Sequence, residues 1–169
     1  MGIAERKERD KLEMRKSIID AAMHMFMYEG YENVSIRKLA DKIEYSPATI
    51  YLYYKDKDEL LYDVQAECFG KLMDVFTTHA TATDPIEKLR QIGHAYLTFG
   101  LDNPQLYELM FIMKAPMNTV EDNELWKNGD CAFNFLVDCM TECTEKDLIR
   151  FEHPLQGVLA VWAMAHGLI

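Results

Sequence analysis

Helix-start signals recur at short intervals near the beginning of the chain, and their spacing constrains the fold more than any other feature. Ser35 and Ser46 can each accept a hydrogen bond from the free backbone N–H groups that begin a helix. Pro47 fits the first position of a helix because its missing N–H needs no partner there. The spacing predicts two short helices, over 35–43 and 46–53, joined by a tight turn.

A longer amphipathic helix is predicted before this pair, over residues 5–29. Its apolar side chains recur at the spacing i, i+4, i+7 and i+8, which places them on one helical face. They are Ile18, Ala22, Met25 and Phe26. Gly30 is expected to end the helix because glycine accepts the left-handed conformation that often follows a helix. A long helix followed by two short ones forms a helix-turn-helix unit.

The rest of the chain also shows helical signals. Asp56 with Glu59 predicts a capping box and a fourth helix that continues to about Thr78, and the same pattern recurs at Asp84–Glu87. Further helices are predicted to start after Gly100, at Asn103–Pro104, and to cover 121–143, 145–151 and Pro154 to the end. Alternating strand patterns and hairpin signals are lacking. The predicted fold class is therefore all-α.

The charges divide the chain into two parts. Residues 1–57 hold 11 Lys and Arg against 10 Asp and Glu, whereas residues 58–169 hold 7 against 18. An acidic body disfavours contact with nucleic acid, so polyanion binding is expected only in the first part. We therefore predict a DNA-binding domain over 1–57, joined through the long fourth helix to a body over 58–169.

Several protein classes are disfavoured by what the sequence lacks. It has no apolar run of the roughly 20 residues that a membrane span needs, and its charged start does not resemble a secretory signal. The four cysteines form no CxxC pair, so reduced thiols are expected. Motifs for a catalytic serine, a phosphate loop or a zinc protease are missing. We expect a cytoplasmic protein without membrane contact, cofactor, metal or enzymatic activity.

The second short helix is the predicted DNA-reading element. Its first turn, Ser46 and Pro47, is small, so the backbone can approach base edges in the major groove. Ala48, Thr49 and Leu52 are expected to read the bases, together with Arg37 from the preceding helix.

Phosphate contacts are predicted on either side of this helix. Tyr51, Tyr53 and Lys57 can hold phosphates with hydroxyl and ammonium groups, while Ile50 and Tyr54 face the core. Ser35 is a further candidate because the N–H groups of a helix start attract phosphate.

The body carries methionine and aromatic side chains that either line an adaptable apolar pocket or fill a core. Both readings stay open for these residues. The candidates for binding a small apolar or amphipathic ligand are His94, Tyr107, Met110, Phe111, Met113, Trp126, Phe133 and Trp162. Cys131, Cys139 and Cys143 lie near one helical face, but burial as small apolar side chains explains them better than metal or redox sensing.

Residues 18–61 resemble the DNA-binding head of the TetR family of transcriptional regulators. The stretch AAMHMFMYEGYENVSIRKLADKIEYSPATIYLYYKDKDELL matches the family in its glycine, helix lengths, serine cap, tyrosine cluster and trailing lysine. One departure is Glu44, which stands where the family has glycine. That position is expected to be left-handed and therefore mildly costly for a residue with a Cβ.

The body resembles one TetR C-terminal subfamily through YLTFGLDNPQLYELMF and WAMAHG. The resemblance implies a homodimer that binds a palindromic DNA operator, most often as a repressor, and releases it when an effector binds the body. In that family two C-terminal helices usually form the dimer interface. The chain stops within the first of them, so a body truncated at its C-terminus is expected.

Two alternatives remain. A helical sensor or partner-binding protein that does not read DNA would explain the departure at Glu44. A small α-helical enzyme would instead show turnover that depends on one histidine.

Overall fold

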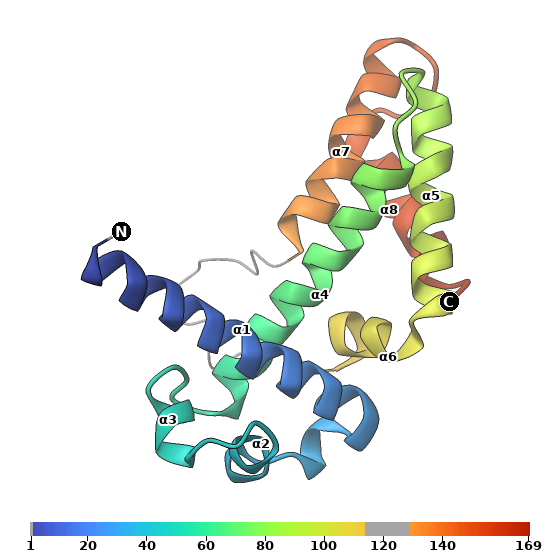
Figure 1. Cartoon of the computed structure of the whole chain (residues 1–169). Helices are drawn as coiled ribbons and strands as arrows, with labels where there is room; N and C mark the ends of the chain where they lie inside the picture. Colours follow the sequence, from blue (N-terminus) through green and yellow to red (C-terminus); the bar gives the residue numbers. More distant parts are fainter. Residues whose placement is uncertain (1, 114–128) are drawn as a thin grey trace. The chain divides into compact units, whose positions relative to one another are not determined.

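The computed structural model describes residues 2–113 and 129–169, apart from the side chain of residue 3. These residues form α-helices and two short helical segments, with no β-strand among them (Figure 1). The all-α prediction is confirmed. Within the described ranges, no helix is both long and apolar enough to cross a membrane.

The chain forms two compact units. The head unit contains residues 2–67 and 108–113, and the body unit contains residues 68–107 and 129–169. Helix α4, Lys57–His79, contributes its first half to the head and its second half to the body. This division describes packing only, and the functional boundary expected after residue 57 stays a prediction.

Helix α1, Ile3–Glu29, is the long helix of the head unit. Its predicted apolar stripe is buried, and Gly30 ends the helix with a φ of 82°. A short 3-10 segment, Tyr31–Asn33, follows. The first half of α1 is exposed, so the packing that holds this helix comes from its second half.

Helices α2, Ile36–Lys42, and α3, Pro47–Tyr51, begin at the predicted caps. The hydroxyl of Ser35 accepts a hydrogen bond from the Lys38 N–H, and that of Ser46 accepts one from the Thr49 N–H, each at 3.2 Å. Helix α3 is shorter than predicted. After Tyr51 the chain tightens into a turn, in which the Tyr53 N–H bonds to the Ile50 carbonyl three residues back.

The turn between α2 and α3 passes through a left-handed residue at the predicted position. Glu44 has a φ of 61°. The N–H of Tyr45 donates to the Ala40 carbonyl at 2.9 Å, and the N–H of Glu44 donates to the Asp41 carbonyl at 3.3 Å. These two bonds form a Schellman motif, which usually carries glycine at the left-handed position. The turn therefore closes regularly but with a strained residue.

The start of α4 is capped slightly differently from the prediction. The Asp56 carboxylate accepts from the Glu59 N–H at 2.8 Å, as expected. The Glu59 carboxylate, however, accepts from the N–H of Lys55 rather than from that of Asp56. Two carboxylates thus satisfy backbone donors on both sides of the cap, which fixes where the α3–α4 turn ends.

The body unit contains the second half of α4 with α5, Pro85–Asp102, α6, Pro104–Tyr107, α7, Asp130–Glu145, and α8, Pro154–His166. Helix α7 packs against both α5 and α8. Asp84 caps α5 through the Glu87 N–H at 2.8 Å. The helix predicted at Asn103–Pro104 is α6, which leads into a π-helical turn, Glu108–Ile112, of the head unit.

The predicted helix over 145–151 is wrong. Helix α7 continues to Glu145 and ends in a second Schellman motif, with Asp147 at a φ of 54° and the Leu148 N–H bonded to the Cys143 carbonyl at 2.9 Å. A left-handed residue reverses the chain direction, so no helix can continue through this segment. The first part of the helix predicted over 121–143, residues 121–128, lies outside the described residues.

Glycine lets α8 lie close to its neighbours. A Cβ added at Gly157 would lie 2.8 Å from the Met140 sulfur and from the Phe151 ring. Such contacts are too short for real atoms, so a side chain here would force the Met140 or Phe151 side chain to move.

Replacing Glu44 with glycine is expected to stabilise the head by about 1 kcal/mol, because glycine removes the left-handed strain. Urea unfolding followed by circular dichroism would measure the difference. Glu44→Ala is the matched control, since alanine keeps the Cβ. Equal stability of the glycine and alanine variants would contradict a strained turn.

Candidate nucleic-acid interface

Helix α3 presents one face to solvent and the other to the head core. Leu52 and Tyr51 are 80% and 56% exposed, and Ala48 is also exposed. Ile50 and Tyr54 are 0% and 1% exposed, as predicted for the inward pair. The side chains predicted to meet DNA are therefore available to a partner, because the helix packs through other residues.

The two hydroxyls at the start of α3 contact each other. Ser46 Oγ and Thr49 Oγ1 lie 2.9 Å apart, and Ser46 Oγ also accepts from the Thr49 N–H. Ser46 thus holds the first turn of α3 in place. The Thr49 hydroxyl, predicted to read a base, already has a partner within the protein.

A partly buried hydrogen-bond network fixes the end of α3 on α4. The Tyr54 hydroxyl donates to the Asp63 carboxylate at 2.8 Å. The same carboxylate oxygen accepts from Arg15 Nε at 3.0 Å and Arg15 Nη2 at 2.5 Å. Burial, followed by the hydrogen bond to Asp63, raises the pKa of Tyr54, so its hydroxyl stays protonated and keeps donating. Asp63 therefore joins α1, α4 and the segment after α3.

A second network ties Lys57 to the segment after α1. Lys57 Nζ donates to the Tyr31 carbonyl at 2.9 Å and lies 3.9 Å from the centre of the Tyr31 ring. The Tyr31 hydroxyl donates to Asp58. Lys57 was predicted to hold a phosphate, but in this structure its ammonium binds the protein's own backbone. This bond uses one of the three N–H donors of the ammonium.

Several cations near α2 and α3 are exposed. Arg37, Lys42 and Lys55 make no side-chain hydrogen bond or ion pair with any residue that the structure describes. Lys38, by contrast, pairs with Glu29 at 2.5 Å. Sequence reasoning did not select Lys42 or the half-exposed Tyr45, although both flank the turn before α3. Their position in the sequence, just before the predicted reading helix, is the signal that could have identified them.

Three of the predicted ligand-binding residues gather in the body unit around His166. Tyr107 bonds through its hydroxyl to His166 Nδ1, and the ring centres of Trp162 and His166 lie 5.1 Å apart. The ring centres of Phe133 and Trp162 lie 5.4 Å apart. Tyr96, which sequence reasoning missed, also bonds to His166 Nδ1 at 2.8 Å.

Burial sets the protonation of this aromatic cluster. It lowers the pKa of His166 and raises that of Tyr96, so both side chains favour their neutral forms. A neutral cluster of rings with hydroxyl and imidazole groups suits an amphipathic ligand as well as a packed core. For Tyr107, Phe133 and Trp162, the pocket and core alternatives therefore both remain open.

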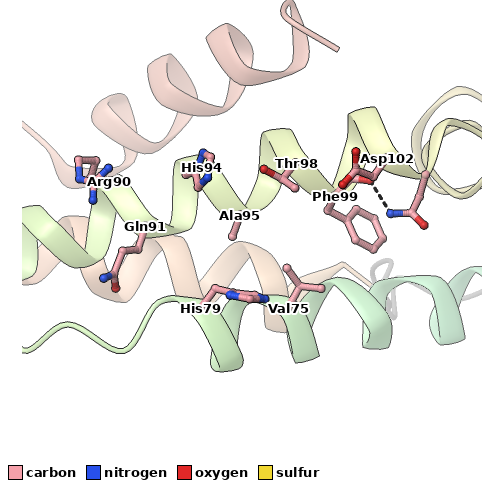
Figure 2. Close-up of a pocket in the computed structure, with 10 residues that line it drawn as sticks. Val75, His79, Arg90, Gln91, His94, Ala95, Thr98, Phe99 and Asp102 are labelled. Carbon is pink, nitrogen blue, oxygen red and sulfur yellow. Dashed lines mark hydrogen bonds between the residues drawn. The ribbon is translucent and has the colours of Figure 1, made fainter.

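His94 does not join this cluster. It lines a separate groove of about 340 Å³ in the body unit, between α4 and α5. Figure 2 shows α5 supplying most of the lining side chains, with Val75 and His79 coming from α4. The lining residues are Val75, His79, Arg90, Gln91, His94, Ala95, Thr98, Phe99, Asp102 and Asn103. The prediction that grouped His94 with the aromatic residues did not take its position in the fold into account.

The remaining predicted ligand residues lie elsewhere. Met110 is buried in the head unit, whereas Phe111 and Met113 are partly exposed there. The buried Gln65 side chain donates to the Leu109 carbonyl at 2.9 Å, which satisfies an acceptor of this π-helical turn. Trp126 lies outside the described residues.

The cysteines of α7 differ in exposure. Cys139 and Cys143 are buried, while Cys131 is exposed. Burial raises the pKa of the Cys139 thiol to about 12, so the metal-binding thiolate is disfavoured. The described residues include no group of three or more metal-ligating side chains.

Comparisons with known proteins match both parts of the chain. The family model described as "Bacterial regulatory proteins, tetR family" matches residues 18–64. The model described as "Tetracyclin repressor-like, C-terminal domain" matches residues 89–169. Together these matches cover most of the sequence.

Individual relatives are more distant. An uncharacterized HTH-type transcriptional regulator of Haemophilus influenzae is 31% identical over 97 residues, 57% of this chain and 52% of that protein. YobS of Bacillus subtilis, also an uncharacterized HTH-type regulator, is 27% identical over 94 residues, 56% of this chain and 49% of that protein. The chain thus spans about half the length of the curated relatives it matches.

Solved structures share the fold. The fatty acid degradation regulator FadR of Bacillus halodurans aligns with a TM-score of 0.66 and 23% identity, covering 89% of this chain and 79% of that one. At this identity the likeness shows a common fold.

Asp63→Ala is expected to destabilise the head by about 2 kcal/mol, because Tyr54 and Arg15 both lose their acceptor. Urea unfolding would measure the change. Asp74→Ala, at an exposed position of the same helix, is the matched control. Similar losses in both variants would show that Asp63 has no special role.

Proposed function

Because the chain belongs to the TetR family of transcriptional regulators, we propose that it binds a palindromic DNA operator as a homodimer and releases it when a small molecule binds the body. The observation that carries this proposal is the exposed face of α3, beneath which Ile50 and Tyr54 are fixed in the core. The family and its relatives regulate transcription and are not enzymes. Repression in the cytoplasm is the expected mode of action.

The DNA contacts divide into base and phosphate contacts. Side chains at the start and exposed face of α3 meet base edges, and polar groups around them hold phosphates. The proposed set is Ser35, Arg37, Ser46, Pro47, Ala48, Thr49, Tyr51, Leu52, Tyr53 and Lys57. In a dimer the two α3 helices would lie about 34 Å apart, one turn of DNA, so that each enters a major groove.

The exposed cations of the head support an electrostatic contribution to DNA binding. Arg37 and Lys55 have no ion pair with the residues that the structure describes, whereas the Lys57 ammonium already donates to the Tyr31 carbonyl. Each phosphate contact releases condensed counterions, so the affinity should fall steeply with salt.

An apolar face on α8 supports dimerisation. Six residues of this helix are exposed and only one of them is polar, which is unusual for a helix surface left in water. They are Leu155, Gln156, Leu159, Ala160, Ala163 and Met164. A second copy offers the same face, and such self-complementary patches form two-fold dimers.

The proposed effector site is the aromatic cluster around His166. Tyr107, Phe133 and Trp162 supply ring surfaces, and the hydroxyl and imidazole groups supply hydrogen bonds. An effector would act by preferring a state in which the two heads no longer match the operator. A preference of about 10⁴-fold suffices for a nearly complete switch.

The regular hydrogen bonds of the α2–α3 turn argue against a head that has lost DNA reading. Glu44 strains the turn but does not open it, since both Schellman bonds are present. The alternative of a sensor without DNA binding therefore gains no support at this position.

Arg37→Ala and Lys55→Ala are each expected to lower the slope of log affinity against log salt by about 1, because each removes one phosphate contact. Anisotropy titrations with a duplex selected from random DNA would measure the slope. Arg150→Ala, an exposed arginine of the body, should leave it unchanged. An unaltered slope in both head variants would rule out these phosphate contacts.

The double variant Leu159→Glu, Met164→Glu is expected to be monomeric, because burying two carboxylates in an apolar interface is costly. Analytical ultracentrifugation would compare it with the unsubstituted chain, which should be dimeric. Leu101→Glu, at an exposed leucine of α5, is the control and should stay dimeric. A monomeric unsubstituted chain, or a dimeric double variant, would contradict the assigned interface.

A further inference from the structure

The reading helix lacks the side chains that usually distinguish bases by paired hydrogen bonds. Residues 46–54 are Ser, Pro, Ala, Thr, Ile, Tyr, Leu, Tyr and Tyr. Guanine is usually read by Arg or Lys, adenine by Asn or Gln, and cytosine by Asp or Glu. None of these six residue types occurs in the segment. Sequence selection by this helix therefore falls to its hydroxyl and apolar side chains.

Its exposed side chains are mainly apolar. Ala48 and Leu52 are four residues apart and thus lie on the same side of the helical turn. Leu52, at 80%, has the largest exposed fraction of the big apolar side chains in the described ranges. The neighbouring hydroxyls of Ser46 and Thr49 already bond to each other. The surface facing outward therefore combines an aliphatic pair with the paired hydroxyls of Ser46 and Thr49 and the exposed ring of Tyr51.

The major groove offers one apolar group, the 5-methyl of thymine. We propose that Ala48 and Leu52 bind thymine methyl groups, so that α3 selects its half-site through thymines. This inference rests on the proposed DNA binding. It adds the base that is selected and the side chains that select it.

The surroundings of the pair favour DNA over a protein partner. Arg37, Lys42 and Lys55 are exposed in the same unit, and residues 1–57 carry a net charge of +1 while residues 58–169 carry −11. An aliphatic pair in the least acidic part of the chain, accompanied by exposed cations, is complementary to a groove between phosphates.

The test uses the full chain and a duplex selected from random DNA. Each thymine of a half-site is replaced by uracil, which removes only the methyl group. At the contacted positions, affinity should fall about fourfold per methyl, the value of one buried CH₂ group. In Leu52→Ala, at least one of these thymine-to-uracil effects should disappear. Leu101→Ala, at another highly exposed leucine, should keep them all.

A second variant tests the assignment without relying on lost affinity. Leu52→Gln places an amide on the same face, and amides pair with adenine. Repeating the selection with this variant should replace a thymine of the preferred half-site by adenine.

The possible failures are distinguishable. If no sequence is selected, the proposed function and this inference both fail. If a sequence is selected but uracil binds as tightly as thymine, or Leu52→Ala keeps every thymine preference, only this inference fails. If Leu52→Ala instead changes the oligomeric state, the pair binds protein and the inference is overturned.

Discussion

The presentation of α3 depends on the hydrogen bonds that the Asp63 carboxylate accepts. It accepts hydrogen bonds from Tyr54, just after α3, and from Arg15 of α1, while it is itself part of α4. A five-residue helix has little stability of its own, so tertiary contacts must hold it. The buried Ile50 supplies the apolar part of that support and Tyr54 the directional part. The exposed face is thereby kept in one orientation.

Local signals predicted most of the head. The caps at Ser35, Ser46 and Asp56 were foreseen because capping depends on residues three positions apart. The left-handed Glu44 followed from the place of a turn glycine in the TetR pattern. The contact of Lys57 with Tyr31 was not predictable in this way, because it joins residues 26 positions apart. Sequence patterns show where helices start but not which surface side chains meet.

The body was harder to predict for the same reason. His94 and Tyr96 are two positions apart, yet one lines an open groove and the other bonds to His166 inside the unit. Residue type alone placed His94 with the aromatic residues, whereas helical geometry turns the two side chains about 200° apart. The segment 145–151 was predicted as a helix. The structure instead has a left-handed residue at Asp147, a conformation that aspartate adopts more readily than most residues.

The central claim is that α3 enters the major groove of DNA. Amide hydrogen exchange of the full chain, with and without its selected duplex, tests this most directly. The account predicts slower exchange in α3 and at the start of α2 when DNA is bound, because these backbones approach the duplex. Protection confined to α8 or to the α4–α5 groove, with α3 exchanging as in the free protein, would contradict it.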